Sequence, residues 1–128
     1  MQVGDPYNDT VRSLFRAPGH AGPCEPVAGR VATGRASAAS DGPRVELCAD
    51  VVDGRLGTCR FRAWRCPHLI AAAELLCRLC ENRPLDDAPF PANEVSRRLS
   101  VPVHKQGLVL MLEDAYNALL ENALEATR

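Results

Sequence analysis

Apolar and polar residues alternate along two segments in the first half of the chain. In the segments 44–51 and 58–64, every second residue is apolar, a period that is typical of strands burying one face. Asp53-Gly54 lies between these segments and is a strong hairpin signal. The pattern predicts two antiparallel strands, with a third strand before them over residues 29–37. The residues expected on the buried face are Val45, Leu47, Ala49, Val51, Cys59, Phe61 and Ala63.

The hydrophobic period changes to that of a helix after these strands. The segment 66–82, CPHLIAAAELLCRLCEN, has helical periodicity, with Pro67 suited to the first helical position and Asn82 to the end. Because the strands come together in the chain and most helices follow them, the sequence predicts an α+β fold, a three-stranded antiparallel meander with helices packed on one face. The other expected helices cover residues 10–17, 92–99 and 108–126.

The composition narrows the class of protein. A chain of 128 residues with 46% hydrophobic residues fits a single domain, residues 1–128, with one core. The 15 basic residues are balanced by 16 acidic residues, so nucleic acid is not expected as a partner. No apolar run approaches the about 20 residues of a membrane span, and no signal peptide is seen, so a cytoplasmic location without membrane partners is expected. In that reducing compartment the six cysteines are expected to be free thiols, metal ligands or reactive groups.

Cys66 is the cysteine whose position favours chemistry. It lies where the last strand gives way to a helix, and the positive end of a helix dipole favours thiolate over thiol. Arg65 adds positive charge beside it. His68, two residues later, is a candidate base or metal ligand. The alternatives are a small buried hydrophobe for Cys66 and a solvated residue for His68.

The other cysteines favour structural roles or stay ambiguous. Cys77 and Cys80 form a C-x-x-C within the expected helix, on the same face as three apolar residues, so core packing is favoured over zinc binding. Cys59 is expected in the core. Cys48 falls on the polar face of its strand together with Asp50, and Cys24 falls in a loop. Arg60, Arg62 and Arg65 suggest either a docking patch for an acidic partner or a solvated sheet face, and the second is favoured.

The chain resembles the iron-sulfur cluster assembly scaffolds of the IscU type, also found as the N-terminal domain of NifU. The resemblance begins at YNDTVRSLFRAPGHAG, is strongest over FRAWRCPHLIAAAELLCRLCENRPLDDA and ends with LEDAYNALLENAL. It covers nearly the whole chain. It implies an IscU/NifU-like fold and a binding and assembly protein rather than an enzyme.

The resemblance also implies a site of three cysteines, an aspartate and a histidine on loops at one end of the sheet. Cys66 matches the second family cysteine and Asp41 matches the aspartate, whereas Ala39 stands where the family has its first cysteine. Gly107 and Leu108 align with the family's His-Cys pair. Since a [2Fe-2S] cluster ordinarily needs four ligands, further ligands must come from elsewhere, and His68, His104, a second chain in a homodimer, or Cys77 and Cys80 are the candidates.

The implied cargo is an iron-sulfur cluster or iron, with zinc as another metal for the same site of Cys66, Asp41, His68 and His104. The implied partners are a cysteine desulfurase or other cluster-assembly proteins. In the family's chaperone-recognition stretch, which corresponds to residues 101–105, only Pro102 and Lys105 agree, which weakens the expectation of chaperone binding.

Three functions therefore compete. The first is a divergent scaffold or carrier that binds iron or accepts sulfur at Cys66. The second is a relative that assembles no cluster and instead binds and modulates assembly partners. The third, ranked last, is a thiol or persulfide transfer enzyme with Cys66 as nucleophile and His68 as base.

Overall fold

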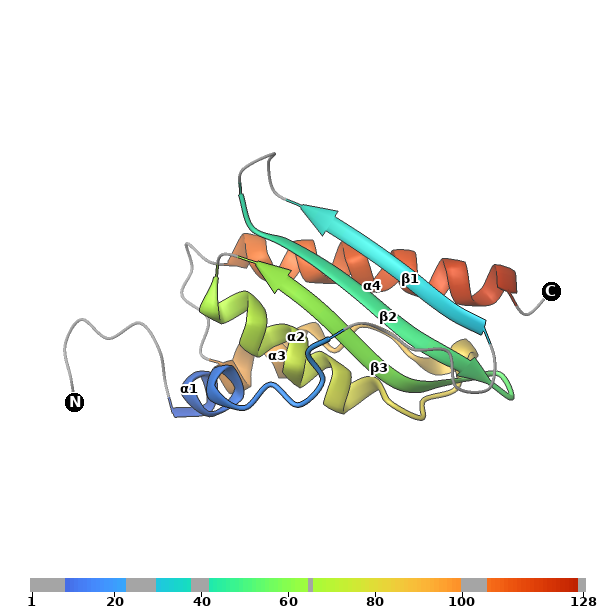
Figure 1. Ribbon diagram of the computed structural model, residues 1–128, viewed down its shortest axis with the longest axis horizontal. Coiled ribbons are helices and arrows are strands. Elements are labelled where there is room, and N and C mark those ends of the chain that lie inside the picture. Colours follow the sequence, from blue (N-terminus) through green and yellow to red (C-terminus); the bar gives the residue numbers. More distant parts are fainter. Residues whose placement is uncertain (1–8, 23–29, 38–41, 65, 100–105, 127–128) are drawn as a thin grey trace.

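The computed structural model describes residues 9–22, 30–37, 42–64, 66–99 and 106–126. Its three strands follow a first helix and precede the remaining helices, and the predicted α+β class is confirmed (Figure 1). The elements in chain order are α1 (Asp9–Arg16), β1 (Arg30–Ser37), β2 (Arg44–Val52), β3 (Arg55–Trp64), α2 (Pro67–Cys80), the 3-10 helix η1 (Leu85–Asp87), α3 (Ala92–Leu99) and α4 (Gln106–Ala126).

The sheet is an antiparallel meander in the order β1-β2-β3. The hairpin between β2 and β3 turns at Asp53 and Gly54, both of which have positive φ. The register shifts between Ala49 and Val51, where two residues of β3, Gly57 and Thr58, lie opposite Asp50 alone. This β-bulge brings the apolar residues of both strands to one face.

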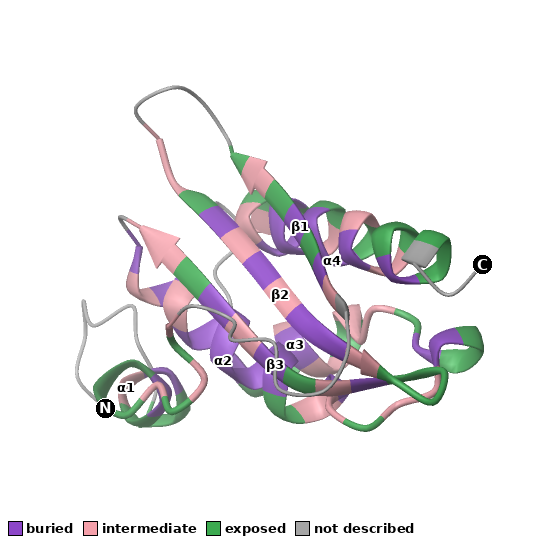
Figure 2. Ribbon diagram, turned by 45° about the vertical axis from the view of Figure 1, so that its right-hand side comes forward, coloured by how far each residue is buried: buried purple, intermediate pink, exposed green. Residues whose placement is uncertain are grey.

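Helices cover one face of this sheet, and no described helix covers the other. The long helix α4 packs against β1 and β2, and α2 packs against β3, with α1 beside α2 (Figure 1). Figure 2 shows the buried residues recurring along the strands and along the helix sides that meet them. The largest fully buried apolar side chains are Tyr116, Phe61, Leu56, Leu69, Leu76, Leu99 and Leu112.

Helix α4 approaches β1 most closely at Gly34. A Cβ atom at this position would lie 2.0 Å from the carbonyl oxygen of Ala115 and 2.5 Å from the backbone nitrogen of Leu119. Beside it, the Thr33 N–H donates to the Asn122 side chain at 2.9 Å. The absence of a side chain at Gly34 therefore sets the place where α4 crosses the sheet.

The segment after α1 pairs with the outer edge of β3. The Phe61 N–H donates to the His20 carbonyl at 3.0 Å, and the Gly22 N–H donates to the Phe61 carbonyl at 2.9 Å. The two segments run parallel at Ala21 and Phe61. This short ladder covers the middle of the β3 edge, and Asn82 and Arg83 pair with Leu56 nearer its start.

Three details differ from the expectations drawn from the sequence. Asp50 is buried, at 8% exposed, although the alternation placed it on the polar face; the bulge interrupts that alternation. Val51, expected to be buried, is half-buried for the same reason. Helix α4 starts two residues earlier than expected, at Gln106. Among the described residues, no helix is both long enough and apolar enough to cross a membrane.

Candidate functional site

One end of the molecule gathers the ends of several elements. Ser37, Arg44 and Trp64 form one row across the ends of the three strands. The first residues of α2 and α4 lie at the same end (Figure 1). Side chains at the start of α2 therefore lie near the end of the sheet where β3 finishes.

Cys66 is the residue that joins β3 to α2. It has extended backbone angles, φ −151° and ψ 119°, and occupies the N-cap position, with Pro67 as the first helical residue. Its carbonyl accepts the Ile70 N–H at 3.1 Å, which closes the first helical turn. The expected position of Cys66 at the start of the helix is thus confirmed. It was predictable because proline favours the first position of a helix and the strand pattern ends before it.

The sulfur of Cys66 lies at the edge of the core rather than in open solvent. The residue is 4% exposed and free, and its side chain makes no capping hydrogen bond. The unpaired N–H groups and the positive dipole of the first helical turn stabilise negative charge at this position. This is a position at which thiols serve as nucleophiles or metal ligands in other proteins.

His68 accompanies Cys66 in the first turn of α2. It is only 2% exposed, so the interpretation of His68 as a solvated surface residue is wrong. The sequence missed this because a histidine in the first helical turn is commonly exposed, whereas here α2 is buried on almost every side.

Of the four predicted ligands, the structure describes Cys66 and His68, which lie two residues apart at the start of α2. Asp41 and His104 lie outside the described residues, as does Ala39 at the first family cysteine position. Within the described ranges, no group of three or more His, Cys, Asp or Glu side chains is arranged to hold a metal ion. Gly107 and Leu108, which align with the family's His-Cys pair, lie in the first turn of α4. Cys66 and His68 alone form the described part of the site.

An aromatic and a basic side chain border this end of the sheet. The Arg44 guanidinium lies 4.1 Å from the centre of the Trp64 ring, a cation–π distance. The two residues pair across β2 and β3. Sequence reasoning missed this contact, because the register that places them opposite each other depends on the bulge at Asp50.

Three further free thiols lie in the core, away from this end. Cys77 and Cys80 are 2% and 1% exposed, which confirms their expected packing role, and Cys59 is buried as expected. Burial raises the pKa of all three thiols, that of Cys59 to about 12. Neighbouring thiols and carboxylates add to the rise for Cys59 and Cys77. These thiols are poor nucleophiles and poor ligands at neutral pH.

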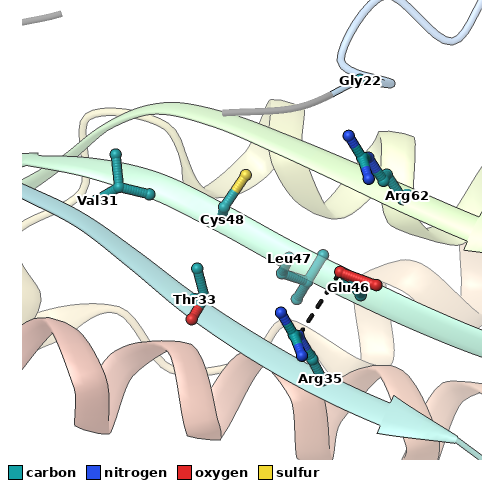
Figure 3. Close-up of a pocket in the computed structure, with 8 residues that line it drawn as sticks. All are labelled: Gly22, Val31, Thr33, Arg35, Glu46, Leu47, Cys48 and Arg62. Atoms are coloured by element: carbon teal, nitrogen blue, oxygen red, sulfur yellow. Dashed lines mark ion pairs between the residues drawn. The ribbon is translucent and has the colours of Figure 1, made fainter. Parts of the chain in front are cut away.

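Cys48 departs from the expectation of free thiols, because it is disulfide-bonded. That expectation came from the compartment, whereas a disulfide depends on the geometry between two sulfur atoms, which the sequence does not reveal. Cys48 also lines a hollow of about 190 Å³ on the open face of the sheet. Figure 3 shows Arg35 and Arg62 with Glu46 in this hollow, and Glu46 pairs with Arg35 at 3.6 Å.

A second polar cluster lies farther along α2, around the fully buried carboxylate of Glu74. This carboxylate accepts hydrogen bonds from the His20 N–H at 2.7 Å, from His20 Nδ1 at 2.5 Å and from Arg78 Nε at 2.8 Å. Burial alone would raise the pKa of Glu74, but these donors lower it below its ordinary value. His20 Nε2 lies 2.9 Å from Glu81, which also accepts the Cys59 N–H. The cluster fixes the segment after α1 against α2, and it was not expected from the sequence.

Comparisons with known proteins agree with the architecture. The family model described as NifU-like N terminal domain matches residues 6–125. A protein from the thermophile Fervidobacterium islandicum AW-1, described as a candidate iron-sulfur cluster assembly scaffold protein for the SUF system, has a similar structure. Its TM-score is 0.58 at 12% identity, with coverage of 95% of this chain and 96% of that chain. At 12% identity, this likeness shows a shared fold alone.

A second solved structure, the N-terminal part of a nitrogen-fixing NifU-like protein from Brucella abortus, aligns with a TM-score of 0.49 at 18% identity. It covers 94% of this chain and 88% of that chain. No curated protein sequence matches the chain at a significant level.

Proposed function

The chain belongs to the NifU-like N-terminal domain family, and we propose that it is a scaffold-type carrier that accepts sulfur or binds iron, alone or in an iron-sulfur cluster, at Cys66. In this proposal the iron and sulfur are cargo, and the protein binds and passes them on rather than acting as an enzyme. Its partners are then a cysteine desulfurase or other cluster-assembly proteins.

The observation that supports this proposal is the position of Cys66. It is a free thiol at the N-cap of α2, where the helix dipole favours the thiolate that both sulfur transfer and iron binding require. The imidazole of His68 lies in the same helical turn. Cys59, Cys77 and Cys80 lack this setting, since each lies in the apolar core with a raised pKa.

The number of donors limits the role of the site. One thiolate and one imidazole fit an anchor for sulfur or iron, but a [2Fe-2S] cluster needs four ligands. We propose that Asp41 and His104, or groups from a partner or a second copy of the chain, complete the set. The same donors suit a single zinc ion, so zinc is the competing cargo.

Anaerobic reconstitution with ferric iron and sulfide tests this function. The wild type should develop charge-transfer absorption in the visible range and retain acid-labile sulfide, and Cys66→Ser should lose both. Cys80→Ser is the matched control, since Cys80 lies 14 residues farther along the chain, about 21 Å along the axis of α2. A colourless wild-type protein that retains stoichiometric zinc would favour the zinc site, and equal loss in both variants would contradict the assignment to Cys66.

A second function is favoured by the residues at the start of α4. Gly107 and Leu108 offer no ligand at the positions where the family has His-Cys, which suits a relative that modulates a cysteine desulfurase without assembling a cluster. Binding of a cognate desulfurase to wild type and Cys66→Ser, measured by titration calorimetry, separates the two. Equal affinity together with failed reconstitution supports the modulator, and reconstitution dependent on Cys66 supports the carrier.

A further inference from the structure

We propose that the C-terminal end of β3 is a docking site for an extended acidic segment of a partner protein, which adds as a strand beside Ala63 and places an apolar side chain between Phe15, Trp64 and Ile70. This inference rests on the sheet edge and its surroundings and is independent of the cargo at Cys66.

The first step is the pairing of the outward-facing backbone groups of β3. In an antiparallel ladder, every second residue directs its N–H and C=O away from the neighbouring strand. Cys59, Phe61 and Ala63 are the successive residues of this kind, because Phe61 bonds to the segment after α1 rather than to β2. The Cys59 N–H is bonded to Glu81 at 3.1 Å. Among the described residues, no backbone bond satisfies the outward groups of Ala63.

The existing ladder ends just before Ala63. Continued parallel pairing would bring the Ala63 N–H to the Gly22 carbonyl, but the last bond of the ladder joins the Gly22 N–H to Phe61. Gly22 has φ +135°, a conformation that residues with a side chain rarely adopt. Among the described residues, the edge is therefore covered up to Phe61 and unpaired from Ala63 onward, which is the arrangement that strand addition requires.

The second step is the groove beside this open edge. It has a volume of about 580 Å³ and is bordered by Phe15 and Pro18 from the end of α1, by Ala63 and Trp64, and by Ile70 of α2. Phe15 is 44% exposed, although Val11 and Leu14 of the same helix are buried. An aromatic ring outside the core, beside an unpaired strand edge, provides a pocket for an alternate side chain of an added strand.

The third step is charge. Arg62 lines both this groove and the hollow on the open sheet face, and Arg16 is exposed next to Phe15. Neither forms an ion pair with a described residue. The acidic residue in the same cross-strand row as Arg62 is Glu46, which already pairs with Arg35. An arginine that lines the groove, with a second exposed arginine directly after Phe15, favours a segment that carries carboxylates.

A partner protein is favoured over a second copy of this chain. Self-association could pair this edge with β3 of a second copy, which would bring the Arg62 side chains of the two chains to the same edge. It could also use the outer edge of β1, but there the Thr33 N–H is bonded to Asn122 of α4. The strand β1 also carries Arg30 and Arg35 and no acidic residue, so it would repel the arginines near Ala63. The edge of β3 therefore matches an acidic strand from another protein better than it matches β1.

Fluorescence anisotropy with two labelled peptides tests the proposal on the full chain. One peptide has a central leucine flanked by alternating threonine and glutamate, and the other has lysine in place of glutamate. The acidic peptide should bind, and Arg62→Glu and Phe15→Ser should each weaken it by about tenfold or more. Arg97→Glu, on the exposed face of α3, is the control and should bind as the wild type does. Equal binding of both peptides, or no effect of either variant, would overturn the proposal.

Two further measurements test strand addition itself. N-methylation of alternate peptide bonds removes the hydrogen-bond donors of one edge of the acidic peptide, and methylation of the edge that pairs with β3 should abolish binding. When the unmodified peptide binds, hydrogen exchange of the Ala63 amide should slow. Binding that survives methylation of either edge, with unchanged exchange at Ala63, would rule out an added strand. A wild-type dimer that Arg62→Glu converts to a monomer, seen by sedimentation velocity, would show instead that a second copy occupies the groove.

Discussion

The two ends of α2 place the same residue type in opposite chemical settings. At its start, Cys66 has extended backbone angles and lies at the positive end of the helix dipole. Toward its end, Cys77 and Cys80 lie within the helix and line a small space together with Leu47, Tyr116 and Leu119. All three thiols are less than 5% exposed. Burial therefore does not distinguish a candidate reactive cysteine from a packing cysteine, whereas position relative to the helix terminus does.

Thiol reactivity is the measurement with the largest expected difference. A rise in the pKa of Cys59 from 9.0 to about 12 reduces its thiolate fraction near neutral pH by a factor of about a thousand. Cys59, Cys77 and Cys80 should therefore remain unmodified by iodoacetamide in the native protein and react fully in denaturant, as read by peptide mass spectrometry. Early native-state labelling of Cys77 or Cys80, with Cys66 untouched, would reverse the assignment of roles along α2.

Removal of the Glu74 carboxylate should have the next largest effect. In Glu74→Ala, the His20 N–H, the His20 ring and Arg78 all lose their shared acceptor. We expect the free energy of unfolding to fall by about 2 to 4 kcal/mol, measured by urea denaturation. Glu121→Ala, at an exposed position on α4, is the control and should change it by less than about 0.5 kcal/mol. Similar losses in the two variants would mean that the cluster contributes little to stability.

Acidification should weaken the same cluster. The pKa of Glu74 is lowered in the folded protein from its ordinary 4.5, so its ionised form stabilises the fold above that value. This contribution is lost as the pH falls through the lowered pKa, because the protonated carboxyl no longer accepts all three bonds. Urea midpoints measured from pH 7 to pH 3 should fall less steeply for Glu74→Gln than for the wild type. Parallel curves would contradict the lowered pKa.

Much of the fold was predictable from local pattern. The change from a period of two to a helical period placed Cys66 at the strand-to-helix junction, and proline fixed the first helical residue. A bulge was also implied. A two-residue turn at Asp53-Gly54 pairs residues whose numbers add to 107, as in Val52 with Arg55. The apolar residues of both strands are odd-numbered, so any pair of them on one face, such as Leu47 with Phe61, has numbers that add to an even sum. The register must therefore shift by one residue between the turn and these pairs.

The place of that shift was not predictable. Its location opposite Asp50 depends on how Gly57 lies against that residue, and it determines that Arg44 faces Trp64. The contacts of Glu74 were equally hidden, because His20 lies 54 residues away in the sequence. Long-range contacts of this kind arise when helices pack on the sheet and leave no trace in local periodicity. The predicted ligand roles of Asp41 and His104 stay predictions, since both residues lie outside the described ranges.

The crossing of α4 over Gly34 gives the helix a pivot. Ala115, at the contact, is nine residues from the start of α4, which is about 13 Å along the axis. A tilt of about 10° around this point would therefore displace Gln106 by about 2 Å. Any residue larger than glycine at position 34 would push the middle of α4 away from β1 and tilt the helix. The displacement would be largest at the ends of α4, and its first turn lies at the same end of the molecule as Cys66. We therefore expect a larger residue at position 34 to shift the first turn of α4 relative to Cys66.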